Sequence, residues 1–116
     1  MDATDNVITV CTRCIDASEK TRPGAALAHL LRHTAPKGFR VEHADCLAGC
    51  GRTTVVAYSG AGKATWVFGD IEQADLPDLL GFARMYAASN DAWFCGRDCP
   101  KKLCDNTLSR VPGLPL

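Results

Sequence analysis

Two stretches of sequence decide the fold: Val7-Ile8-Thr9-Val10-Cys11-Thr12-Arg13-Cys14 and Phe39-Arg40-Val41-Glu42-His43-Ala44-Asp45-Cys46-Leu47-Ala48-Gly49-Cys50. In each stretch, a run with β-strand character leads into a closely spaced cysteine pair. Between them, residues 23–35 have the apolar spacing of a helix that begins near Pro23. A strand, helix, strand unit of this length predicts parallel strands whose carboxyl ends meet at one edge of a sheet. Because open α/β folds build their sites at that edge, we expect the two cysteine pairs to lie side by side.

The rest of the chain predicts two more strands and a second helix. Residues 53–58 and 64–68 have strand character, and the glycines between them favour a hairpin. Apolar residues at helical spacing predict a helix from about Asp75 to Asn90. The order β-α-β-β-β-α is that of a thioredoxin-like α/β domain, with a four-stranded mixed sheet and two main helices. We expect a single domain over residues 1–116, with its core at about 7–90 and a cysteine-containing C-terminal extension at about 91–116.

Composition limits the classes of function. Thirteen basic and thirteen acidic side chains cancel, so net charge gives no support for a nucleic-acid or membrane partner. No apolar run approaches the roughly 20 residues of a membrane span, and the first residues lack the pattern of a signal segment. We therefore expect a cytoplasmic protein. Seven cysteines are an odd count, and in a reducing compartment closely spaced thiols favour metal ligands or redox groups over a disulfide framework.

Four thiols at paired spacing predict a metal centre, and the candidate ligands are Cys11, Cys14, Cys46 and Cys50. A [2Fe-2S] cluster needs four thiolates from separated loops, and it gains from backbone N–H groups that point at its sulfurs. Gly49 and Gly51 flank Cys50 as such N–H contacts would require. Arg13 and Arg52 lie beside the ligand pairs, where we expect them to moderate the charge of a reduced cluster and to help dock an acidic redox partner.

Two other chemistries stay open for these cysteines. Zinc accepts four thiolates at this spacing and would make the protein a structural or interaction module. A thiol-disulfide oxidoreductase would use Cys11 and Cys14 as its dithiol, with one thiol activated by a helix N-terminus. Against the dithiol, the next predicted helix begins well beyond Cys14, and Cys46 and Cys50 are left unexplained. Spacing alone does not decide between iron-sulfur and zinc.

The C-terminal extension carries three further cysteines, Cys95, Cys99 and Cys104. Together with a histidine they could form a separate zinc site. The extension has no second C-x-x-C pair, so we favour thiols without a specific role. Trp93 and Phe94 precede these cysteines and are expected either to pin the extension to the domain or to form a homodimer contact.

The segments around residues 10–14, 45–50 and 62–70, together with the ending at residues 108–112, resemble the DUF1636 family of predicted metal-binding proteins. That family is similar to thioredoxin-like [2Fe-2S] ferredoxins. The resemblance implies Cys11, Cys14, Cys46 and Cys50 as ligands, and it also implies a link to cobalamin biosynthesis. The tight spacing of Cys11 and Cys14 departs from many thioredoxin-like ferredoxins, whose first two ligands are farther apart.

No nucleophile, base and oxyanion arrangement can be assembled from the sequence. We therefore expect a ferredoxin-like one-electron carrier and not a stand-alone enzyme, with an unidentified protein as its redox partner.

Overall fold

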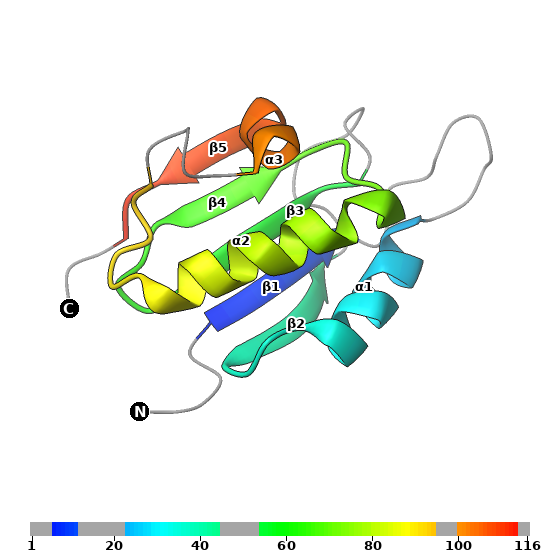
Figure 1. Ribbon diagram of the computed structural model, residues 1–116, viewed down its shortest axis with the longest axis horizontal. Helices are drawn as coiled ribbons and strands as arrows, with labels where there is room; N and C mark the ends of the chain where they lie inside the picture. Colours follow the sequence, from blue (N-terminus) through cyan, green and yellow to red (C-terminus); the bar gives the residue numbers. More distant parts are fainter. Residues whose placement is uncertain (1–5, 12–22, 45–53, 95–99, 114–116) are drawn as a thin grey trace.

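Five strands form one mixed sheet in the computed structural model, which describes residues 6–11, 23–44, 54–94 and 100–113 (Figure 1). The strands are β1 (Asn6–Cys11), β2 (Phe39–Ala44), β3 (Val56–Gly60), β4 (Thr65–Phe68) and β5 (Thr107–Val111). The helices are α1 (Pro23–Thr34), α2 (Leu76–Ala88) and α3 (Lys101–Asp105), and the short 3-10 helix η1 (Gln73–Asp75) precedes α2. Among these residues, no helix is long and apolar enough to cross a membrane.

The strand order is β2-β1-β3-β4-β5. β1 and β2 run parallel, and every other neighbouring pair is antiparallel. The elements from β1 to α2 follow the predicted order β-α-β-β-β-α, with β1 and β2 joined through α1. The predicted count of four strands is wrong, because the C-terminal extension adds β5 at the edge next to β4. The sheet therefore reaches beyond the core predicted at about 7–90.

Both main helices cover the same face of the sheet (Figure 1). Side chains alternate along a strand, and Ile8 and Val10 of β1 and Val56 and Tyr58 of β3 lie in one core cluster. The same cluster takes in buried residues of α1 and α2, such as Leu27, Leu31, Leu79 and Phe82. The other face has no helix among the described residues.

Aromatic rings form the centre of this core. Phe82 of α2 is fully buried and lies edge-on to Tyr58, Phe68 and Trp66, with ring centroids 4.7, 5.1 and 5.4 Å away. Aromatic pairs in this geometry contribute beyond the area that they bury. The hydroxyl of Tyr58 donates to the carbonyl of Leu79 at 2.8 Å, and burial raises the pKa of Tyr58 far above its ordinary value. Trp66 and Phe68 of β4 are buried in the same core cluster.

The hairpin between β3 and β4 is confirmed. The N–H of Lys63 donates to the carbonyl of Gly60 at 3.1 Å, and Gly62 has a φ of 73°, a conformation that glycine adopts without steric cost. The Lys63 Nζ donates to the Tyr86 carbonyl at 2.9 Å near the last turn of α2. The hairpin is thereby fixed to the C-terminal end of that helix.

β5 is an edge strand, and four of its five residues are exposed. Its place beside β4 depends on backbone pairing from Thr65↔Val111 to Phe68↔Thr107. Arg110 adds to this attachment, because its guanidinium lies over the rings of Trp66 and Trp93 and donates to the Phe94 carbonyl at 2.8 Å. An exposed strand of this kind lacks the apolar alternation by which the inner strands are predicted.

Candidate functional site

The carboxyl ends of β1 and β2 lie side by side. Cys11 is the last residue of β1 and Ala44 the last of β2, and the two are partners in the parallel register. The chain therefore enters both cysteine pairs from adjacent strands at one end of the sheet, as predicted. We call this region, with its described residues Cys11, Ala44, Thr54 and Val55, the cysteine end. Of the four predicted ligands, the structure describes Cys11, which is fully buried. Cys14, Cys46 and Cys50 lie outside the described residues.

β3 starts at the same end. The N–H of Cys11 donates to the carbonyl of Val55 at 2.9 Å, so the entry to β3 lies directly beside Cys11. The carbonyl of Thr54 accepts the N–H of Ile71 at 3.1 Å, and this bond ties the segment after β4 to the same end. The chain thus leaves towards Cys46 from Ala44 and returns from Cys50 at Thr54, both next to Cys11.

Thr54 carries an unexplained polar group. The residue is 1% exposed, and its hydroxyl has no hydrogen-bond partner among the described residues. Burial of a hydroxyl without a partner costs roughly 1–3 kcal/mol, and native structures contain few such groups. The one other orphan among the described residues is the Oδ1 of Asn6, at the opposite end of β1.

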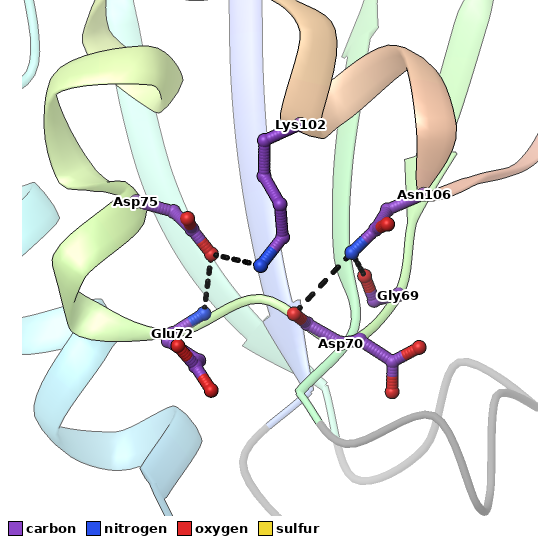
Figure 2. Close-up of polar contacts among 6 residues, drawn as sticks. All are labelled: Gly69, Asp70, Glu72, Asp75, Lys102 and Asn106. Atoms are coloured by element: carbon purple, nitrogen blue, oxygen red, sulfur yellow. Dashed lines mark hydrogen bonds and ion pairs between the residues drawn. The ribbon is translucent and has the colours of Figure 1, made fainter.

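The C-terminal extension returns to the cysteine end before it forms β5. Figure 2 shows the contact made by Asn106, whose side-chain amide donates to the carbonyls of Gly69 at 2.9 Å and Asp70 at 3.4 Å. The N–H of Gly69 donates back to the Asn106 carbonyl at 3.0 Å. Asp70 has a φ of 56°, a left-handed conformation that aspartate adopts more readily than most residues. These bonds fix the turn that follows β4.

An ion pair joins α3 to the start of α2. The Lys102 Nζ lies 3.3 Å from Asp75 Oδ2, which also accepts the Glu72 N–H at 2.9 Å (Figure 2). The Asp75 side chain is 12% exposed and that of Lys102 is 37% exposed. Lys101 pairs instead with Asp105 of its own helix at 3.1 Å, on the surface. The charge of Lys102 therefore links the extension to the start of α2.

Other predicted site residues are placed as follows. Arg13, Gly49, Gly51 and Arg52 lie outside the described residues, as do Cys95 and Cys99. Cys104 lies on α3, half-buried against the core cluster. No group of three or more histidine, cysteine, aspartate or glutamate side chains among the described residues is placed to hold a metal ion.

The three histidines and Phe94, which precedes the cysteines of the C-terminal extension, contact other side chains of the domain. His29 and His33 contact each other edge-to-face on α1, and His43 lies 3.2 Å from Arg32 through Nδ1. Phe94 packs against Trp66 and Phe82, so it pins the extension to the domain, as one of the two expectations held. The homodimer contact stays a prediction.

Sequence reasoning missed Thr54, Asn106 and Asp75 as residues of this end. Thr54 lies in a run of β-branched residues that indicates only a strand. Asn106 and Lys102 lie in the extension, and no periodicity there marks a contact with Gly69 or with Asp75. The one available signal was Asp75 beside Pro77, which predicts a helix start and not an ion pair.

Comparisons with known proteins give one family. A comparison with curated proteins and another with solved structures find no match to this chain. The model of the family described as "Protein of unknown function (DUF1636)" matches residues 8–113. This range includes β1 through β5, apart from the first two residues of β1, and every cysteine of the chain. The chain belongs to the DUF1636 family.

Proposed function

We propose that this protein is a thioredoxin-like [2Fe-2S] electron carrier, with Cys11, Cys14, Cys46 and Cys50 as the cluster ligands. The observation that carries the proposal is the pairing of Cys11 with Ala44 at the ends of two parallel strands. Because of this pairing, the segments that contain the two cysteine pairs begin at neighbouring strand ends. The order β1-α1-β2-β3-β4-α2 supports the thioredoxin-like fold.

The donor set fits the cluster chemically. Four thiolates from two separated loops are the usual ligands of a [2Fe-2S] cluster. Burial of Cys11 on all sides suits a metal-bound sulfur that is kept from water. The hydroxyl of Thr54 at the same end is a hydrogen-bond donor without an acceptor among the described residues. When bound, the cluster would supply reversible one-electron transfer.

The chain's own residues would hold and tune that group. Arg13 lies between Cys11 and Cys14 in the sequence and Arg52 lies just after Cys50, and their positive charges would favour the reduced, more negative state of a nearby centre. Backbone N–H groups at Gly49 and Gly51 would add donors toward sulfur. The same two arginines offer an acidic redox partner a docking surface. The link to cobalamin biosynthesis stays a prediction from the family resemblance.

One structural feature weighs against a dithiol enzyme. Activation of a thiol by a helix dipole needs the thiol in or next to the first helical turn. α1 begins at Pro23, well beyond Cys14 along the chain. Cys14 is therefore not part of the first turn of α1, and its sequence position gives no support for activation by that helix.

Metal analysis of the anaerobically purified protein tests the proposal. Iron, acid-labile sulfide and zinc are measured on one sample, together with the visible spectrum and the EPR spectrum after dithionite reduction. Iron and sulfide in equal amounts, about two of each per chain, with a rhombic signal on reduction, would support the carrier. Zinc alone would replace it by a zinc-stabilised module. Absence of both metals, with a low-pKa thiol at Cys11 or Cys14, would replace it by a thiol-disulfide oxidoreductase.

A further inference from the structure

The Thr54 hydroxyl stands out among the threonines that the structure describes. Thr34 and Thr107 each donate to the carbonyl four residues earlier, at 2.7 and 2.9 Å. Thr9 and Thr65 are partly exposed, so water can reach them. Thr54 is 1% exposed, and within the described part of the chain its hydroxyl has no acceptor.

Its position relates this hydroxyl to the cysteines. Thr54 is the first described residue after the segment that holds Cys46 and Cys50. Its neighbour Val55 accepts the backbone N–H of Cys11 at 2.9 Å. The backbone carbonyl of Thr54 is bonded to Ile71, so the backbone of this residue is held in place while its hydroxyl is unpaired among the described residues.

A thiolate or sulfide sulfur is the acceptor that the cysteine end would provide. Such a sulfur carries negative charge, and hydrogen bonds to charged acceptors are about twice as strong as neutral ones. Hydrogen bonds to sulfur are among the features that set the potential of an iron-sulfur cluster. A hydroxyl that costs free energy in the metal-free chain would find its partner when the cluster is bound.

We propose that the Thr54 hydroxyl donates a hydrogen bond to a sulfur of the cysteine-bound cluster and raises its reduction potential, an inference that rests on the proposed function. The bond is stronger in the reduced state, because reduction adds negative charge to the cluster. Thr54 is therefore a tuning residue and not one of the ligands.

Substitutions that separate the hydroxyl from the size of the side chain test this inference. Thr54→Val keeps the shape and removes the hydroxyl, Thr54→Ala removes it in a smaller side chain, and Thr54→Ser keeps it. Thr65→Val, at the far end of the sheet, is the matched control. The readout is the midpoint potential of the iron-loaded proteins by EPR-monitored titration, with iron and sulfide content and circular dichroism on the same samples.

We expect Thr54→Val and Thr54→Ala to lower the equilibrium constant for reduction by about tenfold, which is about 59 mV for one electron. Thr54→Ser and Thr65→Val should keep the wild-type potential. The metal-free Thr54→Val protein should be as stable as wild type or more stable, because it no longer buries an unpaired hydroxyl. Thr54→Ala gives the same comparison if the valine variant does not fold.

Two results would overturn the inference, and they are distinguishable. Iron-loaded Thr54→Val and Thr54→Ala with wild-type potentials would show that the hydroxyl has another partner, such as a buried water, while the proposed function stands. A wild-type protein without iron and sulfide would overturn the proposed function and this inference together.

Discussion

The two ends of the sheet differ in what lies beside their buried polar groups. At the end opposite the cysteines, which we call the closed end, Lys63, Tyr86 and Trp66 bond to backbone carbonyls at 2.7 to 2.9 Å. The amide oxygen of Asn6 is the one orphan there among the described residues. At the cysteine end, two strands end and a third begins beside Cys11, and the Thr54 hydroxyl has no partner within the described chain. Each end thus holds one buried polar atom without a partner among the described residues, and at the cysteine end this atom belongs to the neighbour of Val55, which is bonded to Cys11. On the proposed function, the cysteine end binds the cluster, while the closed end and the core supply stability.

The sharpest test of this division is removal of one proposed ligand. Cys46→Ser should abolish cluster binding, because serine rarely replaces a thiolate on iron without loss of the centre. Cys104→Ser is the matched control, since α3 lies outside the proposed ligand set, and it should keep its iron. Iron and sulfide content per chain is the measurement. Full iron content in Cys46→Ser would remove this residue from the site.

A change in the core should lower stability and leave cluster binding intact, the opposite of the result expected for a ligand. Phe82→Ala removes a fully buried ring that contacts Tyr58, Phe68 and Trp66, and it should lower the free energy of unfolding by about 3–5 kcal/mol. Urea unfolding of the metal-free proteins measures this loss. The fraction that remains folded should still bind iron and sulfide in the wild-type ratio. A changed ratio would mean that the core and the cysteine end are not separable.

Local sequence patterns predicted the elements whose burial depends on periodicity. α1, α2 and the β3-β4 hairpin follow from apolar spacing and glycines, and they lie where expected to within a few residues. β5 could not be predicted in this way, because four of its five residues are exposed and its attachment is by backbone pairing with β4. The stacking of Arg110 on Trp66 and Trp93 is a contact between distant segments that no local pattern marks.

In the candidate site, too, local sequence patterns predicted some features, while others depend on contacts between distant segments. The cysteine spacing and the strand before each pair predicted which strand ends would meet, and the register of Cys11 with Ala44 agrees. The burial of Thr54 and the contact of Asn106 with Gly69 depend on segments that are far apart in the sequence. Such features appear only once burial and partners are known.

Tyr58 lies between the two ends of the sheet, and its buried hydrogen bond tests the stability of the core. Tyr58→Phe loses the bond to the Leu79 carbonyl and should lower the free energy of unfolding by about 1–2 kcal/mol at neutral pH. Burial raises the pKa of Tyr58, so its contribution is complete below about pH 10, the ordinary value, and is lost as the pH rises further. The difference between wild type and Tyr58→Phe should therefore shrink above about pH 10. Urea unfolding from neutral pH to about one unit above that value measures it, and a constant difference would contradict the stated cause.

The smallest expected effect tests whether the C-terminal extension helps to hold the cysteine end in place. Lys102→Met removes the partner of Asp75, whose carboxylate is mostly buried, and should cost about 1 kcal/mol, an effect that salt weakens. Lys101→Met, the control, breaks an exposed pair within α3 and should cost at most about 0.5 kcal/mol. Amide exchange at Gly69, whose N–H bonds to Asn106, should quicken in Lys102→Met alone, because α3 then holds the turn after β4 less firmly. Equal exchange in both variants would mean that the side-chain and backbone bonds of Asn106 fix this turn without the ion pair.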